Sequence, residues 1–86
     1  MTLRHLRIFV AVAESLNMHA AAKQLYIAQP AISQAISELE NHYNVRLFER
    51  LSKKIYITPA GSQFLFHAKH ILSLFGELEH NRVYGS

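Results

Sequence analysis

A chain of 86 residues that is 50% hydrophobic and 17% charged can form one small folded domain, and its composition is not that of a disordered segment. It contains no Cys, and its six acids are all Glu, which excludes disulfides, thiolate metal sites, Cys nucleophiles and Asp-bearing catalytic triads. The net charge of +3 favours a polyanionic partner, because residues 1–58 hold seven Lys or Arg against four Glu while the remainder is balanced.

Two helices are predicted at the start of the chain. Thr2 can cap the first, over residues 3–15, and Asn17 can cap a second helix of about two turns. Both helices have apolar side chains that recur at the helical period. The apolar face of the first helix consists of Leu3, Leu6, Phe9, Val10, Ala13 and Leu16, and that of the second consists of Met18, Ala21, Ala22 and Leu25.

A third helix is predicted to begin near Gln29, after a turn over residues 26–28. Pro30 suits its first turn, where a missing N–H costs nothing. Its expected buried stripe consists of Ile32, Ile36, Leu39 and Tyr43. The remaining faces carry short and mostly polar side chains, namely Gln29, Ala31, Ser33, Gln34, Ser37 and Glu38.

A small β-hairpin and a long helix are predicted for the rest of the chain. The β-forming residues 55–57 follow a polar, basic stretch, which places the hairpin tip near residues 52–54. Thr58 and Pro59 give a cap followed by Pro at the first helical position, so a last helix should run from Pro59 to about Arg82. At 1.5 Å per residue it would span roughly 36 Å, which is too long for the core of so small a domain.

The last helix has two apolar lines. One repeats at spacings of four and three, and the other has two members seven residues apart. One line should pack against the first helix and the other across a homodimer, and the spacing leaves open which does which. The expected dimerisation residues are therefore Phe64, Leu65, Ala68, Ile71, Leu72, Phe75 and Leu78.

The order of these elements is that of a mainly α winged helix-turn-helix: a three-helix core, a small β-hairpin as the wing, and a long C-terminal linker helix. Gln29, Ser33 and Gln34 can both donate and accept hydrogen bonds, so they suit base edges in a major groove. Ala31 and Ser37 share the outer surface of the same helix, where DNA contact and simple exposure are equally consistent with the pattern.

Three cations in the predicted hairpin suit the phosphates beside such a groove. They are Arg50, Lys53 and Lys54. For Arg50 an ion pair with Glu40 or Glu49, which would tie the wing to the third helix, is an equally good interpretation.

Several segments together carry a resemblance to a known family. They are Leu6–Glu14 (LRIFVAVAE), Ala21–Leu25 (AAKQL), Gln29–Ser33 (QPAIS), Leu47–Arg50 (LFER) and Thr58–Gly61 (TPAG), with Ile36, Leu39 and Glu40 between them. In this register, over almost the whole chain, the sequence resembles the N-terminal DNA-binding domain of LysR-type transcriptional regulators of bacteria.

The resemblance implies sequence-specific binding of double-stranded promoter DNA by a homodimer, at an operator that is an interrupted dyad. It implies that Gln29, Pro30, Ser33 and Gln34 contact DNA from the recognition helix, and that Lys53 stands at a wing position that is usually Arg.

The chain also departs from the family pattern. Ala28 stands where a Ser or Thr cap is frequent, Gln34-Ala35 replaces a frequent Arg-Gln pair, and Met18-His19 replaces a frequent Phe-Thr. These differences bear on base preference and on phosphate contacts.

The resemblance also implies a division of the chain. Residues 1–58 would form the DNA-binding domain and residues 59–86 the linker helix. Full regulators of this type carry an effector-binding domain after that helix, and the 86 residues leave no room for it. We therefore expect an excised or truncated module, with any small-molecule effector acting only through the missing domain.

Other classes of function fit less well. The alternative is a winged helix that serves as a protein-interaction or dimerisation module without specific DNA binding. We expect no enzyme and no catalytic residue, because the chain has no Gly-rich phosphate loop and no nucleophile and base at a usable spacing. His67 and His70 are three residues apart, but no nearby residue completes a metal site, so neither metal nor cofactor is expected.

A membrane location is not expected either. The uncharged apolar stretch near the N-terminus, residues 8–13, is far shorter than the roughly 20 residues of a membrane span, and it lacks the flanks of a signal peptide. The sequence therefore predicts a soluble protein of the cytoplasm.

Overall fold

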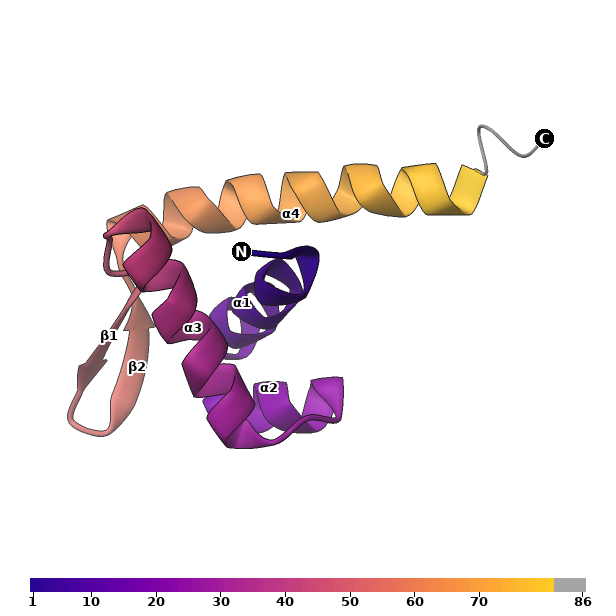
Figure 1. The fold of residues 1–86 in the computed structure, drawn as a ribbon. Coiled ribbons are helices and arrows are strands. Elements are labelled where there is room, and N and C mark those ends of the chain that lie inside the picture. The colour runs from indigo at the N-terminus through magenta and orange to yellow at the C-terminus, as the bar shows by residue number, and fades with distance from the viewer. Residues whose placement is uncertain (82–86) are drawn as a thin grey trace.

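The computed structural model describes residues 1–81 and contains, over that range, four helices and one antiparallel hairpin. The elements in chain order are α1 (Leu3–Ser15), α2 (Met18–Leu25), α3 (Gln29–Tyr43), β1 (Phe48–Leu51), β2 (Lys54–Ile57) and α4 (Pro59–Asn81). Figure 1 shows the hairpin at one side of the helical bundle and α4 reaching past the other helices. The mainly α winged architecture is confirmed, and only the expected end of α4 near Arg82 lies outside the described residues.

Local capping signals define where α1 and α2 begin. The backbone N–H of His5 donates to Oγ1 of Thr2 at 3.4 Å, and the backbone N–H of Thr2 donates back to Nδ1 of His5 at 3.1 Å, so a His completes this capping box. Asn17 then accepts from the backbone N–H of Ala20 at 2.9 Å. Two backbone amides at the start of α1 and one at the start of α2 are thereby satisfied by side chains.

The turn before α3 lets α2 and α3 cross closely. Tyr26 ends α2 in the left-handed region with φ 57°, and the N–H of Ile27 returns to the carbonyl of Ala22 at 3.1 Å. Ala21 and Ala22 are both buried at this crossing. α3 begins without a side-chain cap, because Ala28 offers no acceptor, and Pro30 occupies its first turn.

The core is built around α1, which packs against α2, α3 and α4. Phe9 is completely buried, and its ring lies 5.2 Å from that of Phe48 in β1 and 4.9 Å from that of Phe64 in α4. A single apolar face was expected for α1, yet Ile8, Ala11 and Val12 are buried as well. Helices on three sides bury more of α1 than one amphipathic stripe would predict.

Two residues of the predicted apolar faces are more exposed than expected. Leu16 ends α1 in the left-handed region and is exposed. Tyr43, the last residue of the α3 stripe, is also exposed, although its ring lies 5.4 Å from that of Phe64. Both stand at helix ends, where the core no longer covers the whole side chain.

The wing, which comprises β1, β2 and their turn, is a hairpin of two four-residue strands, with Phe48 opposite Ile57 and Leu51 opposite Lys54. Ser52 and Lys53 form its two-residue tip and both have positive φ, of 49° and 67°. This is the backbone of a tight hairpin turn that Gly or Asn usually occupies. The predicted tip is confirmed, with Lys54 one step further in, within β2.

The half-buried carboxylate of Glu40 in α3 holds the wing in place. Oε2 of Glu40 accepts from the backbone N–H groups of Leu47 at 2.7 Å and of Phe48 at 3.2 Å. These are the amides that lead into β1. A carboxylate hydrogen bond to backbone N–H groups is stronger than a neutral one, so Glu40 fixes the point at which the wing leaves the core.

α4 begins on the predicted cap. The N–H of Gly61 donates to Oγ1 of Thr58 at 2.9 Å, and the Thr58 hydroxyl donates to the carbonyl of Arg46 at 2.6 Å. Gly61 is buried directly against the carbonyl of Leu47, where only a residue without Cβ fits. The first turn of α4 is therefore joined to the chain that enters the wing.

The N-terminal part of α4 packs on the core of its own chain. Ala68 is buried there, and Phe64, Leu65 and Leu72 are half-buried against the same core. Two polar contacts continue along the helix: Nζ of Lys69 lies 3.0 Å from Oε2 of Glu14, and Cζ of Arg7 lies 5.7 Å from the centre of the Phe75 ring. The expected division into one line for the core and one for a partner is therefore wrong, because residues of both lines, Phe64 and Ala68 of one and Leu65 and Leu72 of the other, pack on the core.

The two glycines of α4 give a matched test of this packing. In Gly61→Ala the new methyl group would overlap the Leu47 carbonyl oxygen and lie 2.7 Å from Cγ1 of Ile57, so the free energy of unfolding should fall by about 1–3 kcal/mol. In Gly76→Ala the methyl group meets nothing within 4 Å, and the free energy should rise by about 0.5–1 kcal/mol. Urea denaturation measures both, and an equal response would contradict the close approach at Gly61.

Candidate nucleic-acid interface

The outer face of α3 presents the side chains that the sequence singled out for DNA contact. Gln29, Pro30, Gln34 and Ser37 are exposed. Ala31 and Ser33 are half-buried, and the Ser33 hydroxyl donates to Sδ of Met18 at 3.4 Å. α3 therefore offers a polar surface in which Ser33 is recessed toward α2.

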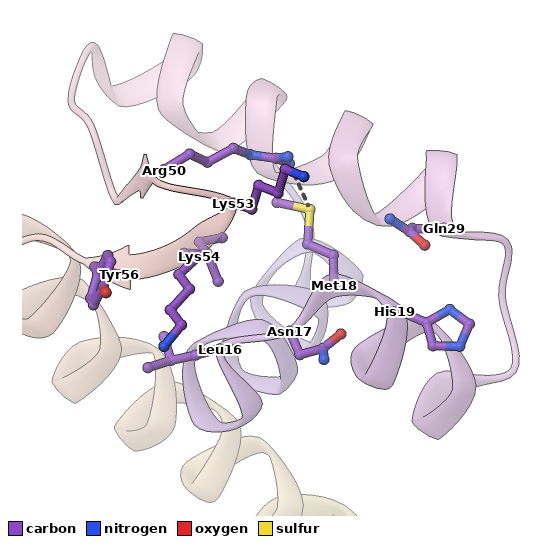
Figure 2. Close-up of a pocket in the computed structure, with 10 residues that line it drawn as sticks. Leu16, Asn17, Met18, His19, Gln29, Arg50, Lys53, Lys54 and Tyr56 are labelled. Atoms are coloured by element: carbon purple, nitrogen blue, oxygen red, sulfur yellow. Dashed lines mark hydrogen bonds between the residues drawn. The ribbon is translucent and has the colours of Figure 1, made fainter.

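A hollow of about 580 Å³ lies between the start of α2, the start of α3 and the wing. Figure 2 shows Arg50 and Lys53 reaching from the wing toward Met18, with Gln29 and His19 on the opposite side. The residues that line it are Leu16, Asn17, Met18, His19, Gln29, Arg50, Lys53, Lys54, Ile55 and Tyr56. The structure thus brings Gln29 of α3 and the three predicted wing cations to one concave surface.

Met18 joins the two sides of this surface. Its Sδ atom lies 3.4 Å from Oγ of Ser33 in α3 and 3.4 Å from Nη2 of Arg50 in the wing. A thioether is a weak acceptor, so these contacts orient the two side chains without holding them tightly. The sequence marked Met18 only as part of an apolar face, and no local signal indicates that residues 15 and 32 positions away meet at its sulfur.

No ion pair of Arg50 with Glu40 or Glu49 forms in the part of the chain that the structure describes. Glu40 is occupied by the backbone of Leu47 and Phe48, and the ion pairs within residues 1–81 are His5 with Glu38 and Glu14 with Lys69. Arg50 is exposed and makes no ion pair over this range. Its charge is therefore available to an external anion.

A second, smaller groove runs on the other side of Met18, with a volume of about 300 Å³. Ser33 and Ser37 of α3 line one wall, and Arg46 and Arg50 contribute the cations. Arg46 was missing from the candidate residues, because the sequence assigned it to neither helix nor hairpin. A Lys or Arg next to the first strand of a predicted wing is the signal that would have found it.

One carboxylate interrupts this basic surface. Glu38 of α3 lies with Oε1 2.7 Å from Nε2 of His5 and with Oε2 3.3 Å from Nε2 of Gln34. The hydrogen bond from His5, followed by that from Gln34, lowers the pKa of the Glu38 carboxyl from its ordinary value of 4.5. Glu38 thus stays ionised beside Gln34, one of the predicted base contacts.

The arrangement suits an anionic double helix better than a small molecule. Four cations, Arg46, Arg50, Lys53 and Lys54, come from one short segment beside the exposed end of a helix. An α-helix fits the major groove of B-DNA, and cations on either side of it can neutralise the flanking phosphates. Both hollows lie between elements, are open to solvent and are lined by several charged or polar side chains.

Other kinds of site have little support. Over residues 1–81 no three His or Glu side chains come together in a way that could hold a metal ion, and His67 and His70 are both exposed on α4. None of the helices in this range is long and apolar enough to cross a bilayer.

The fold and this surface together define a winged helix-turn-helix domain. A model of the family described as "Bacterial regulatory helix-turn-helix protein, lysR family" matches residues 3–62. The chain belongs to this family.

Among curated proteins, the chain is 47% identical over 74 residues to the HTH-type transcriptional regulator TfdS of Cupriavidus pinatubonensis. The matched segment covers 86% of this chain and 25% of that protein. The chain thus spans about a quarter of the length of the curated relatives it matches. TfdS and other curated relatives, such as TcbR of a Pseudomonas strain and HcaR of Escherichia coli, are named as regulators or activators of transcription.

Solved structures of DNA-binding domains also superimpose closely on this chain. The CbnR DNA-binding domain, crystallised in a complex with DNA, superimposes with a TM-score of 0.89 at 43% identity, over 95% of this chain and 94% of that one. The BenM DNA-binding domain in complex with catB site 1 DNA gives a TM-score of 0.90 at 39% identity, over 100% of this chain and 99% of that one.

The lowered pKa of Glu38 predicts a pH-dependent contribution to stability. Because the folded protein binds this proton less readily than the unfolded chain, the contribution should be complete above the unfolded value of 4.5 and be lost as the pH falls through the lowered pKa. The advantage of the wild type over Glu38→Gln in thermal unfolding should therefore shrink between pH 6 and pH 3. Glu79→Gln, at an exposed carboxylate of α4, is the control, and a pH-independent gap for Glu38→Gln would contradict the assignment.

Proposed function

We propose that this chain binds double-stranded promoter DNA sequence-specifically, as the DNA-binding domain of a LysR-type transcriptional regulator. The observation that carries the proposal is the exposed polar face of α3 bordered by wing cations, with Arg50 engaged by no carboxylate within residues 1–81. The crystallised DNA complexes of the CbnR and BenM domains support it, because this chain superimposes on both over nearly its whole length.

In this function α3 lies in the major groove. Gln29, Ser33 and Gln34 read base edges, and Gln is suited to the N6 and N7 atoms of adenine. Pro30 and Ala31 offer apolar contact to a thymine methyl group, and Pro30 also presents no competing N–H at the start of the helix. Ser37, one turn beyond Ser33, reaches a base or the edge of the backbone.

The wing and the segment before it bind the phosphates. Arg50, Lys53 and Lys54 project from the wing beside α3, and Arg46 lies next to Ser37 on the other side. Such contacts set the register of the protein on DNA without reading its sequence. The positive φ of Lys53 is consistent with this role, because a strained backbone position is kept where its side chain has a function such as ligand binding.

We further propose that α4 pairs two copies of the chain. Three leucine or isoleucine side chains remain open on one side of α4, with Ile71 43%, Leu74 53% and Leu78 44% exposed. An apolar groove of about 480 Å³, lined by Tyr43, Phe64, His67 and Ile71 among others, continues this line onto the domain. A second copy covers it and presents a second α3, as an interrupted dyad operator requires.

The dimerisation residues divide accordingly. Ile71 and Leu78 remain available to a partner, and Phe75 is half-buried at the edge of the exposed line. Leu74, which belongs to neither predicted apolar line, joins them. Phe64, Leu65, Ala68 and Leu72 instead serve mainly the core of their own chain. Of these, Phe64 also lines the groove.

The proposal extends to the whole regulator. Residues 1–58 act as the DNA-binding domain and residues 59–86 as the linker helix, of which 82–86 lie outside the described range. A small-molecule effector acts through a further domain, in keeping with the quarter of the curated relatives that the chain spans. The regulator works in the cytoplasm, where bacterial promoter DNA lies.

DNA binding is tested by comparing one base-reading and one phosphate-binding variant. Gln29→Ala should reduce the preference for a selected operator over random duplex by about 1–3 kcal/mol, because it removes a base contact. Lys53→Ala should lower the affinity for selected and random duplex by the same factor. It should also reduce the slope of log affinity against log salt concentration by about one. Fluorescence anisotropy across a salt series measures both.

The control for charge is Lys69→Ala, which removes a cation that Glu14 already pairs on the far side of the fold. It should change affinity much less than Lys53→Ala does. A salt-independent affinity would contradict DNA binding, and association of the protein without any bound duplex would favour the interaction-module alternative.

The dimer is tested on the exposed line of α4. Leu78→Glu should shift the chain toward the monomer, because it places a charge within the apolar surface that two copies bury. Ser73→Glu adds the same charge on another exposed face of the helix and should leave the association unchanged. Sedimentation velocity measures the masses, and an unchanged mass for Leu78→Glu would overturn this interface.

A further inference from the structure

We propose that His5 and Glu38 are positioning residues that fix the orientation of the Gln34 side-chain amide, and thereby favour adenine over guanine at the base pair that Gln34 reads. The inference rests on the proposed function, because it concerns how the same helix discriminates between bases. Neither His5 nor Glu38 needs to touch DNA for this role.

The three side chains form a continuous chain of hydrogen bonds from α1 to the outer face of α3. Gln34 and Glu38 are one helical turn apart, and Nε2 of Gln34 donates to Oε2 of Glu38 at 3.3 Å. The other carboxylate oxygen, Oε1, lies 2.7 Å from Nε2 of His5. Glu38 therefore bridges a residue of the predicted DNA surface and a residue of the neighbouring helix.

The capping box of α1 determines which nitrogen of His5 carries the proton. The backbone N–H of Thr2 donates to Nδ1 of His5 at 3.1 Å, so Nδ1 acts as an acceptor. In the neutral ring the proton is then on Nε2, which is the atom that faces Glu38. His5 thus offers Glu38 a donor at a fixed place, and its side chain is only 17% exposed compared with 51% for Glu38.

The fixed carboxylate decides how the Gln34 amide is turned. An ionised carboxylate only accepts hydrogen bonds, so the amide nitrogen of Gln34 must face Glu38, and the flipped amide would set oxygen against oxygen. Oε1 of Gln34 and its second N–H are left for a partner. Adenine matches this pair with the donor N6 and the acceptor N7, whereas guanine offers two acceptors, O6 and N7.

A purely structural role for the ion pair predicts something different. Exposed ion pairs contribute little to stability, so removing this one should leave the domain folded. A structural pair would affect stability, or all DNA sequences alike, but not the preference at one base pair. The preference at that position is therefore the property that separates the two roles.

Selection from a random duplex pool, by the 86-residue chain and by its Gln34→Ala variant, identifies the base pair whose preference depends on Gln34. Fluorescence anisotropy then compares two duplexes that differ only in having adenine or guanine at that position. Glu38→Ala and His5→Ala should each reduce the adenine preference there by up to about tenfold and leave other positions unchanged. In the Gln34→Ala background, Glu38→Ala should cause no further loss. Glu14→Ala, at the other ion pair of α1, is the matched control and should keep the wild-type preference.

Three results would overturn the inference. The first is a full adenine preference in Glu38→Ala and His5→Ala, and the second is an equal loss of affinity for both duplexes. The third is an unchanged selection in Gln34→Ala. A wild-type chain that binds no duplex at all would instead contradict the proposed function, and with it the inference, before any variant is compared.

Discussion

The complete burial of Phe9 is the constraint on which the other elements depend. The centre of its ring lies 5.2 Å from that of Phe48 and 4.9 Å from that of Phe64, so one side chain of α1 contacts both the start of the wing and α4. Aromatic contacts at these distances restrict ring orientation as well as separation. Since α3 also packs on α1, the position of the wing relative to α3 follows from how α1 is buried.

The acidic and basic side chains of this domain have separate tasks. Glu40 accepts two backbone hydrogen bonds at the entrance to the wing, and Glu38 accepts from His5 and Gln34. These hydrogen bonds orient both carboxylates of α3 but leave their charge in place. The outward surface beside α3 is nevertheless basic, because residues 46–54 carry four cations against the single carboxylate of Glu49.

α4 packs on its own domain over its first turns only. Its first turns are tied to the domain through Thr58 and the buried Gly61, and Ala68 is buried against the same core. Further along, Leu74 and Leu78 are exposed, so the apolar character of the helix continues after its own domain has ended. A helix that is apolar beyond its own domain presents a surface that a partner can cover.

The sequence by itself determined the elements and the outward positions of α3, because caps, Pro30 and the Thr58–Pro59 start are local signals and side-chain direction follows from the helical period. Tertiary structure alone decided that α1 is buried on several sides and that Leu74, rather than Leu72, stays open on α4. It also decided the pairing of His5 with Glu38 and of Met18 with Arg50. Residues more than thirty positions apart meet only because separate elements pack together, which no local pattern encodes.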